Sequence, residues 1–165
     1  MLIWFVVMSV VATFVVFQSP AIDYRLVALG SVVPLVEVPF GAGPLHSLAV
    51  PTVVLGVVML ATRHRRLVRR QWLGLPIGMY LHVVLDLAWT RTDAFWWPFL
   101  GAGFSEGGAL ETGRGIWSLL MELVALVVGV WAYGRFGLDD AERRRRFLRT
   151  GQLDRSVMGP GPTPS

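Results

Sequence analysis

A stripe of four residues spaced four apart dominates the middle of the chain: Gly74, Gly78, His82 and Asp86. On an α-helix this spacing brings all four residues onto one face. Two glycines on one face let a neighbouring helix approach closely, which is a common way for helices to pack inside a membrane. Ionisable groups at membrane depth are costly, about 2.5–3.5 kcal/mol for an Asp at a helix centre. The stripe therefore predicts that other parts of the chain supply polar partners for its imidazole and its carboxylate.

The composition of the chain indicates a membrane domain rather than an ordinary soluble one. Of its 165 residues, 54% are hydrophobic and 16% are charged, and the mean hydropathy is +0.57. There is no Cys, which excludes disulfides and thiolate metal sites. All 15 basic residues are Arg, a hint of a GC-rich bacterial genome. In so hydrophobic a chain the Arg clusters indicate membrane orientation before nucleic-acid binding, so no nucleic-acid partner is expected.

Five apolar segments predict an all-α fold, a polytopic transmembrane helical bundle of about five spans. The segments are residues 2–17, 26–40, 46–61, 72–90 and 115–133. Gly30, Pro34 and Pro39 interrupt the second one, and prolines within a span require protein or a cavity to take up the freed backbone groups. If this segment is re-entrant, the bundle has four spans. Residues 1–135 should form the transmembrane helical domain.

Two Arg-rich regions set the predicted orientation. The positive-inside rule places the loop at residues 63–70 and the tail at residues 136–165 in the cytoplasm. With five spans the N-terminus then lies outside a bacterial cytoplasmic (inner) membrane and the C-terminus inside. The tail should contain a short basic helix, from about Asp139 to Arg149, that lies on the inner leaflet. Residues 159–165 (GPGPTPS) should be disordered.

Five ionisable residues fall at a common predicted depth, between the midplane and the outer face of the membrane. They are Glu37, His46, His82, Asp86 and Glu122. At about 1.5 Å per residue, Asp86 lies roughly 21 Å from the inner end of its helix. Imidazoles and carboxylates without a thiol match a divalent metal such as Zn²⁺ or Mn²⁺. We expect His46, His82 and Asp86 to bind this metal, with Glu37 as a fourth or orienting ligand, and we expect Asp86 and Glu122 to be catalytic, Glu122 by proton transfer.

Each of these residues also has a structural interpretation. His82 and Asp86 could pair with each other, one helical turn apart, and stabilise the packing of helices. His46 could be an interfacial residue that is hydrogen-bonded to water, and Glu37 could hydrogen-bond the proline-broken backbone. Glu122 could pair with an arginine or with His82.

The order of several motifs in the chain is similar to that of a known family. Matching positions are Pro34 and Glu37, His46-Ser47, Gly78, His82 through Asp86, and Trp97-Pro98-Phe99. Over about residues 23–101 this pattern resembles the bacterial inner-membrane metal-dependent hydrolases, a family that includes LexA-regulated membrane proteins. The resemblance implies a membrane enzyme that hydrolyses a lipid-linked or interfacial substrate with the help of a bound metal.

Two motifs depart from the family pattern. The family's Pro-Asp-x-Asp is Pro34-Leu35-Val36-Glu37 here, so one carboxylate is lost and the other is lengthened. The family's Thr-His-Ser is Leu45-His46-Ser47 here. A second function class therefore stays beside the hydrolase: a non-catalytic membrane protein whose buried polar cluster is structural and whose basic tail binds lipid or a partner.

Overall fold

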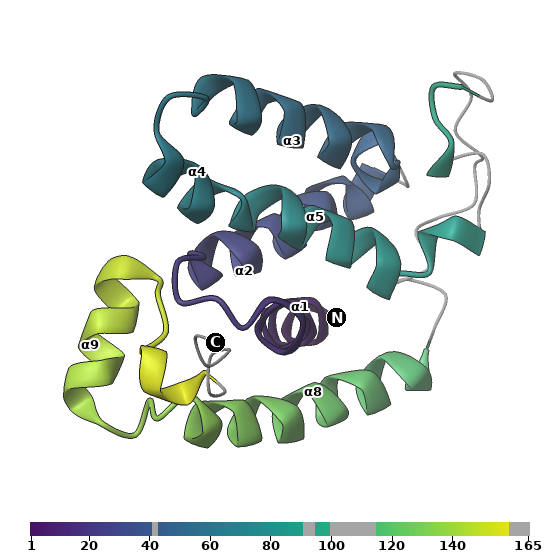
Figure 1. The fold of residues 1–165 in the computed structure, drawn as a ribbon. Coiled ribbons are helices and arrows are strands. Elements are labelled where there is room, and N and C mark those ends of the chain that lie inside the picture. Colours follow the sequence, from purple (N-terminus) through teal and green to yellow (C-terminus); the bar gives the residue numbers. More distant parts are fainter. Residues whose placement is uncertain (41–42, 91–94, 100–114, 159–165) are drawn as a thin grey trace, which may run out of the picture.

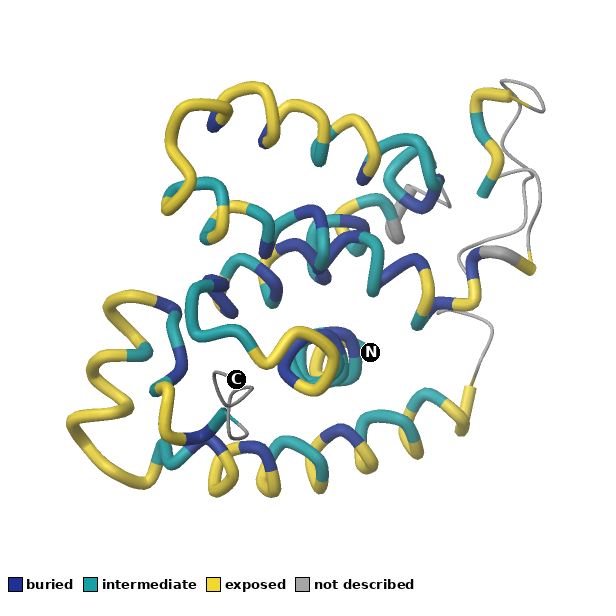
Figure 2. The backbone as a smooth tube through the Cα atoms, viewed as in Figure 1, coloured by how far each residue is buried: buried dark blue, intermediate teal, exposed yellow. Residues whose placement is uncertain are grey.

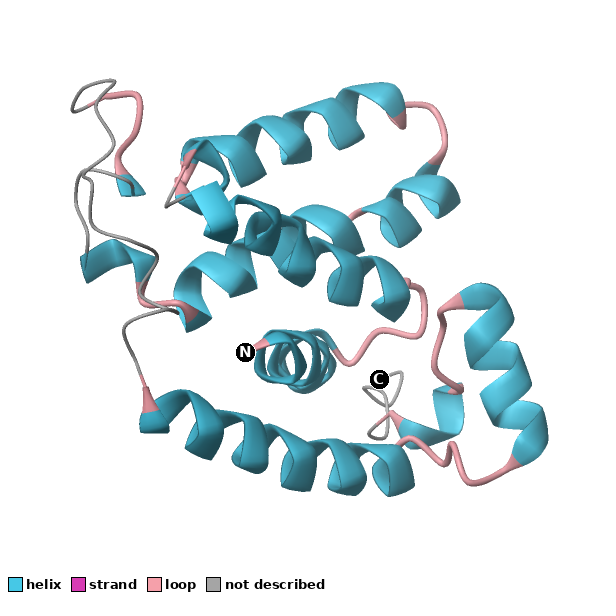
Figure 3. Cartoon of the chain, turned by 180° about the vertical axis from the view of Figure 1, so that it is seen from behind, coloured by secondary structure: helices cyan, strands magenta, loops and turns pink. Residues whose placement is uncertain are grey.

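The computed structural model describes residues 1–40, 43–90, 95–99 and 115–158, and within these ranges all regular secondary structure is helical. The predicted all-α fold class is thereby confirmed (Figures 1 and 3). The α-helices are α1 (Leu2–Phe17), α2 (Tyr24–Val32), α3 (Ala49–Ala61), α4 (Arg66–Trp72), α5 (Gly74–Leu85), α8 (Ile116–Arg135) and α9 (Ala141–Thr150). Short 3-10 helices are η1 (Val33–Phe40), η2 (Pro44–His46), η3 (Ala88–Thr90) and η4 (Arg155–Val157).

Helix α1 lies at the centre of the molecule. Figure 1 views it nearly along its axis, with α2 and α5 on one side and α8 on the other, and α1 contacts all three. Its uninterrupted apolar sequence predicted a helix over residues 2–17, and the structure has the same bounds. The helix ends at Gln18, whose φ of 42° breaks the helical path before Ser19-Pro20.

The glycine stripe packs α5 directly against α2, as its spacing predicted. A Cβ built on Gly78 would overlap the backbone carbonyl of Val27. The contact is reciprocal, because a Cβ on Gly30 of α2 would overlap the carbonyl of Leu75. Since any side chain at these positions would force the two backbones apart, the close approach of α2 and α5 requires glycine at both.

Leaving the short α4 aside, the bundle helices alternate in direction along the chain: α2 and α5 run one way, and α1, α3 and α8 run the other. The neighbouring residues that establish this are Asp23–Gly74 and Ser31–His82 for α2 with α5, Phe5–His82 and Phe17–Ile77 for α1 with α5, His46–His82 and Thr52–Tyr80 for α3 with α5, and Trp4–Glu122 and Phe14–Phe136 for α1 with α8. The consequence is a bundle with two unlike ends. Arg25, the Arg-rich loop at 63–70 and Arg135 lie at one end, whereas His46 and His82 lie toward the other.

Prolines account for two of the places where the observed helices differ from the predicted segments. The segment predicted over residues 26–40 is an α-helix only to Val32 and continues as η1, which contains Pro34 and Pro39. The fourth helix, predicted over residues 72–90, corresponds to α5, which begins at Gly74. Helices α4 and α5 are separated at Leu73, because Pro76 has no N–H to donate to the carbonyl of Trp72. Helix α5 also ends earlier, at Leu85, and the third helix begins at Ala49 rather than at residue 46.

Helix length does not by itself support five complete membrane spans. Among the described residues, α8 alone, with 20 residues, is both long and apolar enough to cross a bilayer. Helices α1 and α3 are apolar but have only 16 and 13 residues. The structure therefore establishes the all-α architecture, and the five-span bundle stays a prediction.

The distribution of polar and apolar residues differs from that of a water-soluble bundle. Large apolar residues of α8 are exposed, and Ile116, Leu119 and Val130 are 70–75% exposed. Figure 2 shows exposed residues, in yellow, along the length of this helix. Polar side chains are buried inside the bundle beside apolar ones, and they are Ser9, Thr13, Ser31, His46, Ser47, His82 and Asp86. Polar residues are normally the exposed ones, and large exposed apolar patches mark a surface that meets a partner or a membrane.

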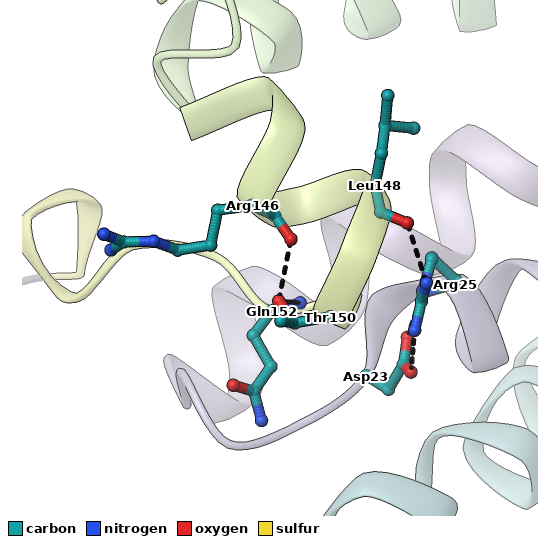
Figure 4. A network of polar contacts seen from close by, with 6 residues as sticks. All are labelled: Asp23, Arg25, Arg146, Leu148, Thr150 and Gln152. Carbon is teal, nitrogen blue, oxygen red and sulfur yellow. Dashed lines mark hydrogen bonds and ion pairs between the residues drawn. The ribbon is translucent and has the colours of Figure 1, made fainter. Parts of the chain in front are cut away.

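The tail packs against the Arg-rich end of the bundle. Leu153 and Val157, which are 4% and 5% exposed, join a hydrophobic cluster with Phe14 and Phe136. Figure 4 shows the guanidinium of Arg25 between the Asp23 carboxylate and the carbonyl oxygen of Leu148, the latter at 2.8 Å. The predicted basic helix is present as α9, capped by Asp140 rather than Asp139. Residues 159–165, predicted to be disordered, lie outside the described residues.

Candidate functional site

Two histidines far apart in the sequence meet inside the bundle. His82 lies in the last turn of α5 and His46 ends η2, and neither side chain is exposed. Their ring centroids are 5.3 Å apart with an interplanar angle of 70°, an edge-to-face arrangement. The structure thus brings together two of the three residues that the sequence predicted as principal metal ligands.

The ring of His82 is held by a backbone group and by an aromatic ring. Its Nδ1 lies 2.7 Å from the carbonyl oxygen of Ser31 on α2. Because a carbonyl can only accept, Nδ1 carries the proton in this bond, and Nε2 of a neutral ring is then the atom with a free electron pair. Phe5 of α1 stacks on the other face of the ring at 4.1 Å and 29°.

The ring of His46 is oriented by a carboxylate. Its Nδ1 lies 3.4 Å from Oε2 of Glu37, and the same oxygen accepts the backbone N–H of Leu45 at 2.9 Å. A Cβ built on Gly43 would lie 2.6 Å from this carboxyl group, so a glycine in the turn makes room for it. Nε2 of His46 is buried and has no hydrogen-bond partner among the described residues. Buried polar atoms are almost always paired, so this atom marks a site where a ligand could bind.

The two anchored imidazoles match one half of the predicted metal site. Metal-binding histidines usually donate their other ring N–H to a carboxylate or a backbone carbonyl, as His46 does toward Glu37 and His82 toward Ser31. The carboxylates do not complete the set, because no group of three or more His, Asp or Glu side chains that could hold a metal occurs within the described ranges. Binding of a metal at His46, His82, Asp86 and Glu37 therefore stays a prediction.

Asp86 is fully buried at the C-terminal end of α5. Its backbone N–H donates to the carbonyl of His82 at 2.8 Å, which closes the last helical turn, and Leu87 then leaves the helix with a φ of 58°. The spacing of four residues predicted that Asp86 follows His82 by one helical turn, and the structure has it there, as the C-terminal cap of α5. A buried carboxylate one turn from the histidine pair fits both interpretations given above, ligand and structural partner.

Glu122 contacts the beginning of α1. Its carboxylate lies 3.1 Å from the amino group of Met1 and accepts the backbone N–H of Trp4 at 3.3 Å. Of these two partners, Met1 precedes α1 and Trp4 lies in its first turn, next to Phe5, which contacts His82. The predicted role of Glu122 in proton transfer stays a prediction, and the contacts described here are structural.

Sequence reasoning missed two groups that build the site. The carbonyl of Ser31 is a backbone group, so residue type carries no signal for it. Phe5 is one aromatic residue in an apolar run, and nothing in the pattern distinguished it from its neighbours. The glycine stripe indicated a close contact between α5 and another helix, but not that this helix is α2.

The Trp-Pro-Phe motif lies beside the start of α3. The backbone N–H of Leu48 donates to the carbonyl of Phe95 at 3.0 Å. Leu48 and Thr52 line, with Phe95, Trp96 and Phe99, an apolar cavity of about 330 Å³. Leu48, which lines this cavity, follows His46 by two residues, and neither histidine of the pair lines the cavity itself.

The chain as a whole matches no protein-family profile, no curated protein and no solved structure. The resemblance to the inner-membrane hydrolases therefore rests on the motif positions alone.

Proposed function

We propose that this protein is an integral membrane protein of the bacterial cytoplasmic membrane, and that its His46–His82 pair binds a divalent metal ion used to hydrolyse a lipid-linked or interfacial substrate. The observation that carries the proposal is the distribution of polar and apolar residues: two imidazoles and a carboxylate lie inside a bundle whose outer surface is apolar. A bilayer is the solvent for which this distribution is favourable.

The direction of the helical segments supports a bundle that crosses the membrane. Helix α5 follows α4 directly, and the uncharged part of the two, Gln71 to Leu85, covers 15 residues, about 22 Å at 1.5 Å per residue, with Arg66, Arg69 and Arg70 before it. The alternating directions place Arg25, the loop at 63–70 and the tail at one end, as the positive-inside rule requires for the cytoplasmic face. The histidine pair then lies toward the outer face.

The metal-binding part of the proposal is supported by the way in which the two rings are held. Glu37 and the Ser31 carbonyl occupy the two Nδ1 atoms, which leaves Nε2 as the coordinating atom of each ring. A divalent ion bound there would supply Lewis-acid activation of water, the chemistry that a metal-dependent hydrolase needs. The chain's own contribution is to orient the imidazoles, exclude bulk water and offer the apolar cavity near Leu48 to the substrate.

Elemental analysis of the detergent-purified protein tests this proposal. We expect about one divalent metal per chain, lost in His46→Ala and in His82→Ala. His64→Ala is the matched control, because His64 is exposed in the Arg-rich loop, where it accepts from Arg63 at 2.9 Å. Wild-type protein that is free of metal after purification and metal supplementation, and equally stable with and without a chelator, would contradict the proposal.

A structural role for the polar cluster is the second candidate. The observation that favours it is that Glu37 already accepts the N–H of Leu45 and orients His46. Its carboxylate therefore has hydrogen-bond partners without a metal. On this reading Glu37→Gln, which can still accept these bonds, would leave stability unchanged, and neither histidine variant would alter the metal content.

A further inference from the structure

An apolar groove runs between α1, α2 and α8 at the Arg-rich half of the bundle. Its volume is about 340 Å³. Its walls are Val7 and Val10 of α1, Ala28 of α2 and Gly129 of α8, and Leu138 and Phe147 close it at the tail. Two of these residues, Ala28 and Gly129, are small, and a Cβ built on Gly129 would lie 3.5 Å from the Val7 side chain, an ordinary van der Waals contact.

A cationic side chain stands at the tail end of this groove. Nη1 of Arg144 donates to the hydroxyl of Tyr133 at 3.2 Å and lies 3.5 Å from the carbonyl oxygen of Leu138, and both residues line the groove. Arg144 forms no ion pair with any described residue. Arg25 also reaches the groove, but the carboxylate of Asp23, at 2.9 Å, already offsets its charge.

We propose that this groove binds an anionic phospholipid of the cytoplasmic leaflet, with one acyl chain between α1 and α8 and the phosphate on the guanidinium of Arg144. This proposal rests on the membrane location proposed above and is independent of the metal. The charge pattern selects the occupant, since an apolar slot that ends at an unpaired guanidinium complements a molecule with an apolar chain and an anionic head.

The packing of the tail gives this site its geometry. Leu153 and Val157 hold the tail against the end of the bundle, so the Arg144 guanidinium is fixed beside Tyr133 instead of moving with a free segment. The other arginines of α9 contribute differently: Arg146, for example, pairs with Asp154 at 2.8 Å. The structure therefore singles out one arginine of the cluster for the phosphate.

The test uses the full chain in a non-ionic detergent, with lipid binding measured by native mass spectrometry and by the shift of the thermal unfolding midpoint. The probes are phosphatidylglycerol, phosphatidylcholine with the same chains, and glycerophosphoglycerol, which has the headgroup but no chain. We expect phosphatidylglycerol to bind at least fivefold more tightly than phosphatidylcholine, and glycerophosphoglycerol not to bind. Equal affinity for the two lipids, or binding of the chain-free headgroup as tight as that of the lipid, would overturn the proposal.

Matched variants test the residues. Arg144→Ala should weaken phosphatidylglycerol about fivefold, the equivalent of about 1 kcal/mol per surface arginine, while Arg144→Lys should retain most of the affinity. Arg145→Ala is the control, because Arg145 is exposed on the same helix and, unlike Arg144, makes no hydrogen bond to the described residues that line the groove. An equal loss of phosphatidylglycerol affinity in both alanine variants would contradict a specific site at Arg144 and indicate a general attraction between α9 and anionic surfaces.

The apolar half of the site has its own pair of variants. Ala28→Phe should fill the groove and weaken both lipids, whereas Leu29→Phe, at a 54% exposed position of the same helix, should weaken neither. If Ala28→Phe binds lipid as the wild type does, the acyl chain does not lie in the groove. Recovery of the protein in the soluble fraction after cell lysis would instead contradict the membrane location, and that result can be told apart from any outcome in detergent.

Discussion

The imidazole of His46 meets the imidazole of His82 edge to face, with the ring centroids 5.3 Å apart, although 35 residues separate them in the sequence. Each ring is anchored through Nδ1 by a different element, η1 through Glu37 and α2 through Ser31. The pair is thus a junction of four segments, and its geometry depends on how closely α2 and α5 pack. The first prediction addresses that packing.

Adding one methyl group at Gly78 should separate α5 from α2. Because the new Cβ would overlap the carbonyl of Val27, we expect Gly78→Ala to lower the free energy of unfolding by about 1–3 kcal/mol. Gly56→Ala on α3 is the control, since a Cβ there meets nothing within 4 Å; it should be neutral or stabilise by up to about 1 kcal/mol through helix propensity. Unfolding by a denaturing detergent measures both, and equal effects would contradict the close approach.

The tail should contribute to the stability of the bundle through its apolar residues. Leu153 is 4% exposed and packs with Phe14 and Phe136, so Leu153→Ala should cost about 2–4 kcal/mol. Leu148, which is 63% exposed, offers the same substitution with an expected change within about 0.5 kcal/mol. The thermal unfolding midpoints of the two variants measure this difference. Equal midpoints would indicate that the tail lies only on the lipid surface and does not pack against the bundle.

The start of α9 should be sensitive to acid. The backbone N–H groups of Arg143 and Glu142 donate to the carboxylate of Asp140 and lower its pKa. The pKa of Asp154 is lowered likewise, first by the N–H of Ser156. For a carboxylate with a lowered folded-state pKa, the stabilisation is complete above the unfolded value of about 3.9 and is lost as the pH falls through the folded value.

Hydrogen exchange of the α9 amides, corrected for the intrinsic rate, measures this effect. Protection should be constant above about pH 4 and fall below it. Asp140→Ala should lower the protection at neutral pH and reduce its acid dependence, whereas Asp139→Ala, which removes the same charge from an exposed position that does not cap the helix, should change neither. If the two variants behave alike, the effect is general electrostatics and not capping.

Much of this architecture follows from local patterns in the sequence. The uninterrupted apolar run at residues 2–17 predicts a helix, which the structure confirms. The glycine spacing of α5 identifies the face that contacts another helix, but not which helix it contacts. The same stripe places His82 and Asp86 on one helix. What these patterns have in common is that each acts within one turn or one helix, where spacing decides which side chains share a face.

The rest depends on contacts between distant segments. Nothing local predicts that Glu122 meets the amino group of Met1, or that Ser31 offers its backbone carbonyl to His82. The burial of Leu153 is another case. Nothing in the arginine-rich sequence of the tail predicts that one of its apolar residues packs against the end of the bundle. Such groups are found only when the packing of whole helices is known.

The contact between the tail and the first loop leads to the last prediction, which concerns topology. Tyr24 donates its backbone N–H to the carbonyl of Gly151 at 2.8 Å, and its hydroxyl donates to the carbonyl of Ser19 at 3.1 Å. Ser19 and the tail therefore lie at the same end of the bundle. A four-span arrangement with a re-entrant segment at 26–40 would place them on opposite sides of the membrane, so the two predicted topologies differ in whether this contact can form.

Fusions of a reporter that is active only after export, placed at Ser19, Gln71 and Gly137, test this topology in cells. We expect all three fusions to be inactive, with a cytoplasmically active reporter giving the complementary signal at each. Export at Ser19 alone would convert the arrangement to four spans and would require the contact between Tyr24 and Gly151 to be absent in the membrane. Export at Gln71 or Gly137 would reverse the orientation and move the histidine pair toward the cytoplasmic face, where a substrate from the outer leaflet could not reach it.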